Sequence, residues 1–524
     1  MAIGERGAVA VLRRAWTLLI LTLVLWGGTG AATAATLVVT KLDDTDDGAC
    51  DGDCSLREAI DAANSGDTVS FAIDVTGTTT LALGELVIDR PLTISGPGRN
   101  ALTISGGDTQ RILTIASTGA LTASGLTFAH GRGQYYAPLG VDAAGAVLNS
   151  GAFAFTDCTF ADNHADGRPN PQFVNDAAVA YSNGFGKTIS FTRCTFRDNS
   201  AGGGACLDID GGTLTITDST FVDNFGEFGP ACVIANSAGP VTIVGTTFEG
   251  NSARAGGALF VSGSGGGTIK NSTLNGNTSA SGFGGGIYVF GPNTVTLSNV
   301  TLSGNVAGTG SNLYLTNGGA VIVRNTILAG TASNCGGTGT ISSHGYNLDT
   351  GNTCGLNAAG DKTNTSSGLV PLGASGGGTP TMPLLATSAA LNSGNPAAPG
   401  SGGDACEATD QRGVARAQLS RCDIGAFELT GPETVGDSGF HDAFDQNLYS
   451  WSAQAGVTQY QTRRSGSPAF IPPCVGITTT GTSWQDTEVP APGAAFFYMN
   501  RPFAPLLGTW GWNSAGVERT TACP

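Results

Sequence analysis

A short phrase recurs along residues 123–330 and constrains the fold more than any other feature of the sequence. Each copy contains an alternating run, then Thr-Phe or Thr-Leu, two further residues and an Asn. Successive Asn residues are about 25–28 positions apart, except for one longer step, and this period is typical of solenoids. The copies are CTFADN (Cys158–Asn163), CTFRDN (Cys194–Asn199), STFVDN (Ser219–Asn224), TTFEGN (Thr246–Asn251), STLNGN (Ser272–Asn277), VTLSGN (Val300–Asn305) and a degenerate NTILAG (Asn325–Gly330).

Apolar and polar residues alternate within each copy, which indicates strands rather than helices. TISFT (Thr188–Thr192) and TLTIT (Thr213–Thr217) are two examples, and a second run such as CLDID lies earlier in each repeat. About three short strands per repeat predict an all-β parallel β-helix. We expect the recurring Asn at a corner, where its side chain tolerates left-handed geometry. Stacked about 4.8 Å apart, these Asn residues would form a structural ladder.

The charge balance bears on the partners of the chain. Only 12% of the 524 residues are charged, and 24 Lys and Arg against 40 Asp and Glu give a net charge of −16. Binding to nucleic acid requires clusters of Lys and Arg. The composition therefore argues against a nucleic-acid partner.

The first 34 residues have the features of an export signal. Arg6, Arg13 and Arg14 form a basic segment, Trp16–Trp26 is apolar, and Ala32-Thr33-Ala34 fits a cleavage site. The apolar run is short for a membrane span, and no second one follows. We expect a secreted or cell-surface protein with no membrane span after cleavage.

Twelve cysteines in an exported chain indicate disulfides. Some pairs hold the same position in consecutive repeats, where stacking brings Cα atoms near the distance that a disulfide needs. The others are neighbours in sequence. The predicted bridges are Cys50–Cys54, Cys158–Cys194, Cys206–Cys232, Cys335–Cys354, Cys406–Cys422 and Cys474–Cys523.

Residues 35–76 predict a cap for the first coil. Ser55 and Glu58 form a capping box at the start of a short helix with an apolar face. A helix there would cover strand edges that a solenoid end leaves open. CDGDCSLREAIDAAN followed by DTVSFAI resembles the CSLREA domain of exported bacterial β-helix proteins, which implies export but no particular reaction.

The β-helix is expected over residues 77–330, and its C-terminal end over 331–430. DQRG (Asp410–Gly413) followed by CDIGAFE (Cys422–Glu428) resembles the end of the choice-of-anchor Q domain. That resemblance implies a right-handed, pectin lyase-like β-helix. Residues 438–524 resemble a fibronectin type III domain, a small β-sandwich with Trp451 and Tyr460 inside, although Phe496 replaces the Tyr that such domains often have.

The best pair of catalytic carboxylates is Asp208 and Asp210, because residues two apart share one face of a strand. If Leu207 and Ile209 point inward, both carboxylates point outward. The coil lacks the further acidic and basic motifs of a hydrolase or lyase, so these are weak candidates. Catalytic residues are otherwise not predicted.

Two further sets of residues are candidates for binding. The irregular region between residues 130 and 187 is rich in aromatic and basic side chains, and long excursions on a rigid scaffold often bind ligands; its glycan-binding candidates are Tyr135, Tyr136, Tyr181 and Phe185. No cofactor is predicted. Carboxylates in two places could bind Ca²⁺, although solvation of these carboxylates is the simpler explanation. These carboxylates are Asp44, Asp46, Asp51 and Asp53 in one loop, and Asp162, Asp198 and Asp223 before the recurring Asn.

We expect a secreted or cell-surface β-helix that adheres to, or binds, a polysaccharide or cell-surface glycan without catalysis. A polysaccharide lyase or glycoside hydrolase is the alternative within the same fold, and a structural envelope component is a third. Carboxylates that converge with a basic residue in a groove would favour the enzyme. The sequence leaves the oligomeric state open.

Overall fold

The computed structural model describes residues 34–504 with short gaps. The residues outside this description within that range are 134, 137–140, 143, 167–176, 185, 203–205, 228–231, 236–238, 281, 331–332, 419–420, 430–437, 440–446, 452–456, 468–469, 471–472, 489 and 492–493. The predicted export signal lies outside the described residues.

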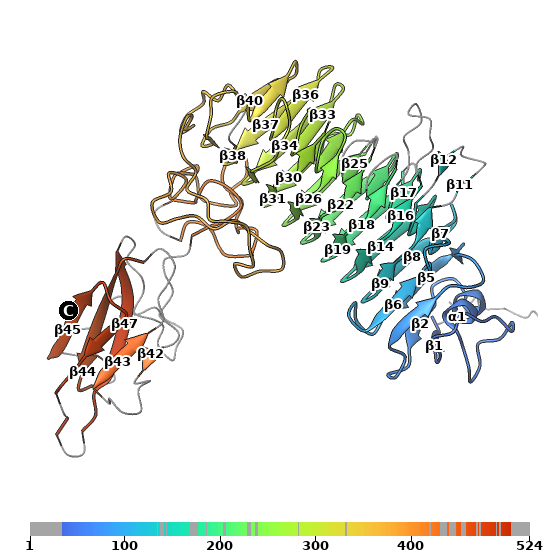
Figure 1. Cartoon of the computed structure of the whole chain (residues 1–524), viewed down its shortest axis with the longest axis horizontal. Helices are drawn as coiled ribbons and strands as arrows, with labels where there is room; N and C mark the ends of the chain where they lie inside the picture. Colours follow the sequence, from blue (N-terminus) through green and yellow to red (C-terminus); the bar gives the residue numbers. More distant parts are fainter. Residues whose placement is uncertain are drawn as a thin grey trace, which may run out of the picture.

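The chain forms a right-handed parallel β-helix with three long parallel sheets (Figure 1). Sheet A contains β1 (Thr36–Val39), β2 (Thr68–Phe71), β5 (Pro91–Ser95), β8 (Ala120–Ser124), β14 (Ala152–Thr156), β18 (Thr188–Thr192), β22 (Thr213–Thr217), β26 (Val241–Val244), β30 (Gly267–Lys270), β34 (Thr294–Ser298), β37 (Ala320–Arg324) and β40 (Thr340–Ser343). Sheet B contains β3 (Gly77–Thr80), β6 (Leu102–Ser105), β9 (Thr127–Ala129), β15 (Thr159–Ala161), β19 (Thr195–Arg197), β23 (Thr220–Val222), β27 (Thr247–Glu249), β31 (Thr273–Asn275), β35 (Thr301–Ser303), β38 (Ile327–Ala329) and β41 (Leu348–Asp349). Sheet C contains β4 (Leu86–Ile88), β7 (Leu113–Ile115), β13 (Val147–Asn149), β17 (Ala180–Ser182), β21 (Leu207–Ile209), β25 (Val233–Ala235), β29 (Leu259–Val261), β33 (Ile287–Phe290), β36 (Leu313–Thr316) and β39 (Cys335–Gly337). The prediction of three strands per coil is confirmed.

Two smaller groups of strands accompany the long sheets. One parallel sheet contains β10 (Arg132–Gly133), β16 (His164–Ala165), β20 (Ser200–Ala201), β24 (Phe225–Gly226), β28 (Ser252–Ala253) and β32 (Thr278–Ser279). An antiparallel pair joins β11 (Tyr135–Tyr136) to β12 (Val141–Asp142). These strands belong to the turns that connect sheet B to sheet C.

Helix α1 (Leu56–Ala62) closes the first coil as predicted (Figure 1). Ser55 accepts a hydrogen bond from the Glu58 amide, and the Glu58 carboxylate accepts one from the Ser55 amide, which completes the capping box. Leu56, Ala59 and Ile60 are buried in the same core as the first coils. The helix thereby covers an edge that would otherwise be open. No helix among the described residues is long and apolar enough to cross a membrane.

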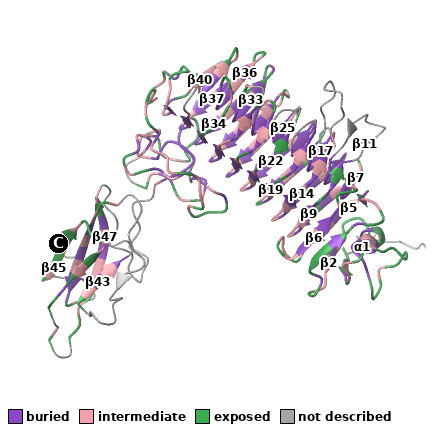
Figure 2. Ribbon diagram, in the orientation of Figure 1, coloured by how far each residue is buried: buried purple, intermediate pink, exposed green. Residues whose placement is uncertain are grey.

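The core of the coil contains a stack of aromatic rings below sheet B. The second residue of each Thr-Phe pair points inward, because successive residues of a strand face opposite sides. Strand register places these rings directly above one another, and Figure 2 shows the buried residues running along the strands. The centroid distances are 5.3 Å for Phe128–Phe160, 5.2 Å for Phe160–Phe196, 4.1 Å for Phe196–Phe221 and 4.7 Å for Phe221–Phe248.

The recurring Asn residues form a continuous buried ladder beside this stack. The Nδ2 group of Asn224 donates to Asn251 Oδ1 at 2.8 Å and to the Phe196 carbonyl at 3.0 Å. Its Oδ1 accepts from Nδ2 of Asn199 at 2.9 Å and from the Asn199 amide at 3.2 Å. The side chain thus uses two donors and two acceptor positions while only 2% of it is exposed. The same arrangement holds at Asn199, Asn251 and Asn277. At Asn163, the first rung, Nδ2 donates to Asn199 Oδ1 but Oδ1 accepts from the Gly131 amide.

The left-handed corner is one residue earlier than the sequence predicts. Asp162, Asp198 and Asp223 have φ values of 53°, 56° and 53°, and Gly250 continues the series at 63°. The Asn itself points into the core, because a buried amide stabilises the stack while a corner residue needs only to tolerate a positive φ. Asp and Gly are both residue types that accept this conformation.

Three predicted disulfides are present, namely Cys50–Cys54, Cys335–Cys354 and Cys406–Cys422. Cys474 is also disulfide-bonded, while its predicted partner Cys523 lies outside the described residues. These bridges belong to the N-terminal cap, the last coil, the segment that follows it and the C-terminal unit. They therefore constrain the parts of the chain that lack the regular repeat.

The two predicted disulfides between coils, Cys158–Cys194 and Cys206–Cys232, are wrong, because all four cysteines are free. In each pair the thiols are neighbours in stacked coils, but a disulfide would hold the two sulfur atoms about 2.05 Å apart. Cys158 Sγ lies 3.3 Å from the Thr156 carbonyl oxygen, and Cys206 Sγ lies 3.0 Å from Cys232 Sγ without a bond. These thiols behave as small buried side chains.

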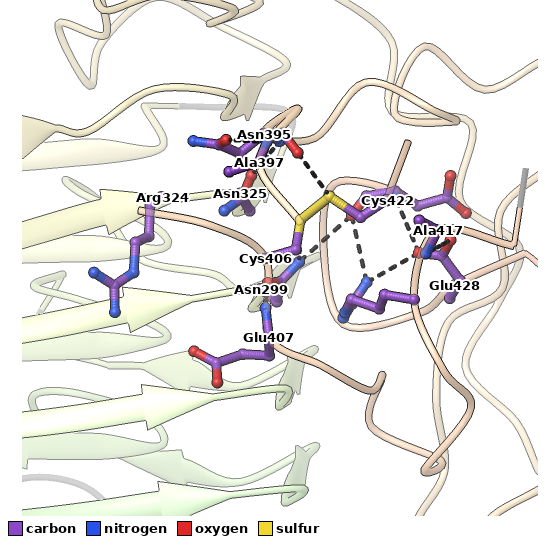
Figure 3. Close-up of a disulfide and its surroundings, with 12 residues drawn as sticks. Asn299, Arg324, Asn325, Asn395, Ala397, Cys406, Glu407, Ala417, Cys422 and Glu428 are labelled. Carbon is purple, nitrogen blue, oxygen red and sulfur yellow. Dashed lines mark hydrogen bonds and ion pairs between the residues drawn. A yellow bond between two sulfur atoms is a disulfide. The ribbon is translucent and has the colours of Figure 1, made fainter. Parts of the chain in front are cut away.

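A segment after the last coil, which we call the strap (residues 368–429), folds back over the β-helix. It docks on three Asn residues at the corner between sheets A and B in successive coils, and Figure 3 shows two of them facing the strap disulfide. Each is in left-handed conformation. The bonds are Asn271 Nδ2 to the Thr409 carbonyl (2.8 Å), the Glu407 amide to Asn299 Oδ1 (2.9 Å) and the Asn395 amide to Asn325 Oδ1 (2.8 Å).

The DQRG and CDIGAFE motifs form a buried ion-pair network inside the strap. Arg412 pairs with Asp410 at 2.7 Å, and Arg416 pairs with Glu428 at 3.3 Å. Both side chains of the second pair are at most 1% exposed. Burial raises the pKa of Asp423 to about 7, and the negative charge of Glu428 adds to the rise. The motifs therefore stabilise the strap rather than face solvent.

The C-terminal unit consists of two small antiparallel sheets and is a separate body in Figure 1. Trp451 and Tyr460 are buried in its core, as the sequence predicts. Tyr498, two residues after Phe496, donates its hydroxyl to Asp486 at 2.9 Å. The strands are β42 (Ser438–Gly439), β43 (Leu448–Trp451) and β46 (Ser483–Gln485) in one sheet, and β44 (Gln459–Ser465), β45 (Cys474–Thr479) and β47 (Phe497–Ala504) in the other.

We expect Asn224→Ala to lower the free energy of unfolding by about 3 kcal/mol or more, because it removes four buried hydrogen bonds and leaves their partners unpaired. The matched control is Asp223→Gly, which keeps the corner geometry of the coils that carry Gly there and should change stability by less than about 1 kcal/mol. Urea unfolding followed by circular dichroism measures both. Equal effects of the two substitutions would contradict the role of the ladder.

Alkylation of the denatured but unreduced chain should modify Cys158, Cys194, Cys206 and Cys232. Peptide mapping by mass spectrometry then locates the label. The same treatment should leave Cys50, Cys335 and Cys406 unlabelled, because these are disulfide-bonded. Recovery of a Cys158–Cys194 or Cys206–Cys232 linked peptide would contradict this assignment.

The strap should become less stable as the pH rises from about 4 to about 7. Asp423 has a folded pKa of about 7, whereas an unfolded Asp titrates near about 3.9. The folded protein therefore binds the proton more tightly, and the stability that this contributes below pH 4 is lost as the pH approaches 7. In Asp423→Asn, the urea midpoint should depend less on pH over this window. An identical pH dependence in both proteins would exclude Asp423 as the cause.

Candidate functional site

A column of threonine hydroxyls runs along the outside of sheet B. The Thr of each Thr-Phe pair faces away from the core, because its neighbour faces inward. Strand register aligns these residues from one coil to the next. The column contains Thr103, Thr127, Thr159, Thr195, Thr220, Thr247, Thr273 and Thr301.

The strap covers one half of this column. Thr247 Oγ1 donates to the Pro380 carbonyl at 2.6 Å, and Thr273 Oγ1 donates to Gln411 Oε1 at 2.7 Å. The Ala426 amide donates to Thr301 Oγ1 at 3.0 Å. All three threonines are at most 1% exposed. The outer face of sheet B can therefore hold an irregular chain by hydrogen bonds to its threonine hydroxyls.

The other half of the column is open to solvent and forms a groove with a volume of about 570 Å³. Thr159, Thr195 and Thr220 contribute to its floor, and Gly378 of the strap closes one end. We call this cavity the arginine groove, because three arginines line it. They are Arg99, Arg193 and Arg197.

Arg193 is held in the arginine groove by a carboxylate of the preceding coil. Its Nε and Nη2 atoms donate to the two oxygens of Asp157 at 2.9 and 2.7 Å. This hydrogen bonding lowers the pKa of Asp157 and raises that of Arg193. Arg99 donates to the Arg193 carbonyl at 2.8 Å, and its Nη2 atom lies 3.8 Å from Asp157 Oδ1, so both guanidinium groups lie next to the same carboxylate. Half of the Arg193 side chain remains exposed, which leaves donors available to a ligand.

Arg197 lies between two carboxylates of the predicted Ca²⁺ ladder. Its Nη1 atom is 3.0 Å from Asp198 Oδ2 and 3.6 Å from Asp162 Oδ2. A guanidinium group therefore offsets the repulsion that stacked carboxylates would otherwise have. Asp223, the third carboxylate of the predicted ladder, lies in the next coil, and its amide donates to the Glu249 carbonyl. Asp218 lines the arginine groove, and burial raises its pKa.

The acidic loop does not assemble a set of metal ligands. Asp44 accepts hydrogen bonds from Arg57 and from the amides of Ala82 and Leu83. Burial acts to raise the pKa of Asp44, but these bonds outweigh it and lower the pKa. Across the described residues, no three His, Cys, Asp or Glu side chains are grouped so as to hold a metal ion. The other carboxylates of the acidic loop accept hydrogen bonds from groups nearby. Asp46 accepts one from the Gly48 amide, Asp51 from the Asp53 amide, and Asp53 from Lys41 Nζ.

The prediction that Asp208 and Asp210 face solvent together is wrong. Leu207 and Ile209 do point into the core, yet Asp208 on the opposite face is also fully buried. Its neighbours in register are Tyr181 and Ile234, two large side chains that are buried as well. Asp210 is half-buried and accepts a hydrogen bond from the Tyr181 hydroxyl at 3.1 Å.

The aromatic candidates separate in the structure. Tyr181 lies next to Asp208 in register, but it is only 5% exposed and cannot serve as an open stacking surface. Tyr135 and Tyr136 form strand β11, and their side chains lie outside the described residues. Phe185 lies outside the described residues as well.

Sequence reasoning missed the arginine groove, although its signals were present. The first residue of each Thr-Phe pair repeats as faithfully as the Asn, and its outward direction follows from the strand period. Arg193 stands directly before the CTF of its repeat, at the corner where later repeats have Asn. Arg99 comes from a coil about 94 positions earlier, so only the folded structure brings the two together.

Comparisons with protein-family models and with curated proteins find no match. Among solved structures, the chain is similar to the pectate lyase Pel9A, with 14% identity and a TM-score of 0.39 over 76% of this chain and 97% of that one. It is also similar to the catalytic unit of a thermostable GH87 α-1,3-glucanase from Streptomyces thermodiastaticus strain HF3-3, with 17% identity and a TM-score of 0.33 over 61% of this chain and 69% of that one. Because both sequence identities and both TM-scores are low, neither structure indicates the function of this chain.

Proposed function

We propose that this chain is a secreted or cell-surface protein that binds an acidic polysaccharide in the arginine groove without cleaving it. The polysaccharide is one with many hydroxyl groups and with carboxylate or sulfate substituents. The observation that carries this proposal is the open half of the threonine column beside Arg99, Arg193 and Arg197.

The strap supports the proposal as an internal example of a bound chain. Over three coils it satisfies the hydroxyls of Thr247, Thr273 and Thr301 with its own polar groups. The open coils offer the same hydroxyls at the same spacing, about 4.8 Å from one coil to the next. Sugar hydroxyls donate and accept hydrogen bonds as the strap's groups do, so an extended glycan can follow the column along the axis of the β-helix.

Three arginines and one carboxylate, Asp218, are the charged side chains that line the groove, and this balance supports an acidic ligand. Arginine presents a planar fork that matches carboxylate and sulfate oxygens. Three of the 24 basic residues of the chain line this one cavity, and the exposed fractions of their side chains are 34%, 50% and 47%. Asp157 fixes the orientation of Arg193 before a ligand arrives, which reduces the entropy lost on binding.

Binding without catalysis fits the environment of the carboxylates that the sequence suggested for a hydrolase. Asp208 is inaccessible to solvent. In the strap, Asp410 and Glu428 form ion pairs with Arg412 and Arg416. The resemblance of residues 35–76 to the CSLREA domain supports export, with residues 1–34 as the signal. The two small C-terminal sheets, as a fibronectin type III-like unit over residues 438–524, would provide a second surface for attachment.

Affinity electrophoresis of the mature chain in gels that contain polygalacturonate or alginate tests this proposal. We expect both polymers to retard the chain, less so at high salt because ions screen the arginines. Arg193→Ala should weaken binding at least tenfold. The matched control is Arg254→Ala, an exposed arginine of a later coil that does not line the groove, and it should bind as the wild type does.

Analysis of the polymers after incubation separates binding from catalysis. New reducing ends or unsaturated products would overturn the non-catalytic proposal, and their loss in Asp210→Asn would then favour the enzyme. Equal retardation of the Arg193→Ala and wild-type chains would exclude the arginine groove as the site.

A further inference from the structure

Five aromatic side chains form a continuous patch on the outer face of sheet C, away from the arginine groove. Three of them hold the same position in successive strands β29, β33 and β36. Centroid distances of 5.1 Å between Phe260 and Tyr288 and 5.2 Å between Tyr288 and Tyr314 link these rings. Phe290 packs beside Phe260 at 6.2 Å, and Phe283 lies 4.8 Å from Tyr314. We call this set the aromatic patch.

The aromatic patch is accessible, unlike earlier positions of the same column. Leu148, Tyr181 and Ile234, which precede Phe260 in register, are at most 5% exposed. In contrast, Phe283 and Phe290 are 41% and 38% exposed, and Phe260, Tyr288 and Tyr314 are half-buried. Exposed aromatic surface costs free energy in water, and a contiguous patch of it marks an interaction site.

The surroundings of the patch carry almost no charge. The 70 residues from 251 to 320 contain two charged side chains, Arg254 and Lys270. Lys270 belongs to sheet A, where it pairs with Glu407 of the strap at 3.2 Å. The polar groups near the rings are neutral, and the Tyr288 hydroxyl lies 3.3 Å from Thr316 Oγ1. A ligand that matches this surface is therefore uncharged.

We propose that the aromatic patch is a second binding site and that its ligand is a neutral polysaccharide. One face of a sugar ring presents C–H groups with slight positive charge, and these pack against the negative face of an aromatic ring. Tyr and Thr hydroxyls at the edge supply hydrogen bonds to sugar hydroxyls. Neighbouring rings lie about 5 Å apart along the β-helix and are nearly perpendicular, at 84° and 77°, so an extended sugar chain would meet the face of one ring and the edge of the next.

The aromatic patch and the arginine groove match ligands of different charge, one neutral and the other acidic. The arginine groove is built of guanidinium groups and hydroxyls on sheet B, whereas the aromatic patch is built of rings without charge on sheet C. The inference therefore does not depend on the proposed function of the groove. A chain with both sites could join an acidic polysaccharide to a neutral one.

Affinity electrophoresis in gels with hydroxyethyl cellulose, galactomannan or soluble β-1,3-glucan tests the second site. We expect at least one of these neutral polymers to retard the mature chain, with little dependence on salt. The double variant Tyr288→Ala/Tyr314→Ala should bind that polymer at least tenfold more weakly, whereas Tyr288→Phe/Tyr314→Phe should retain binding within about threefold because the stacking surfaces remain. Circular dichroism and urea midpoints verify that both variants fold.

Arg193→Ala is the matched control, because it alters the arginine groove and should leave binding to the neutral polymer unchanged. Absence of retardation by all three polymers, or equal retardation of the double alanine variant and the wild type, would overturn the inference. Light scattering after size-exclusion chromatography tests whether a second copy of this chain binds to the aromatic patch instead. A dimer that the double alanine variant disrupts would also overturn it.

Discussion

The ladder of buried asparagines is the interaction on which the β-helix depends. A stack of short strands leaves one polar turn per coil beside an apolar core, and unpaired polar groups there would be costly. Each amide group has two donors and two acceptor positions, so Asn224 can bond the coil before it and the coil after it at once. The ladder shifts to Asn312 and Asn334 near the end and finishes at Asp349, which needs only to accept. Backbone hydrogen bonds between the parallel strands set the spacing of the coils at about 4.8 Å, and the amides and the aromatic rings stack at this spacing.

The same regular stacking accounts for the surface sites. A position that repeats in every coil becomes a column on the outside, and the residue type in the column decides what the surface can bind. On sheet B the column is threonine, and it holds the strap at Thr247 and Thr273 but faces an open groove at Thr159 and Thr195. On sheet C the column changes from buried residues such as Tyr181 to half-buried rings such as Tyr288. The strap defines the groove, because it covers one half of the threonine column and leaves the other half free.

The repeat predicts the strands of the coil correctly, but it does not predict every contact between side chains of successive coils. The spacing of the Thr-Phe pairs predicts the strands and the stacked Asn ladder, because these depend on local periodicity alone. It also suggested a disulfide between Cys158 and Cys194, since equal positions stack, but these buried thiols are free. The prediction for Asp208 is also wrong, because this residue is fully buried on the outward face of its strand between Tyr181 and Ile234, which are buried as well.

The sequence by itself determined the all-β parallel coil, the helical cap with its Ser55–Glu58 capping box and the short-range disulfides, since each follows from residues close together in the chain or from a fixed period. Only the tertiary structure decided which surfaces stay open. Arg99 and Arg193 meet although 94 positions separate them, and the strap returns to coils more than 100 positions earlier. Long-range contacts of this kind depend on how far the coil rises and where the chain turns back, and no local pattern encodes either.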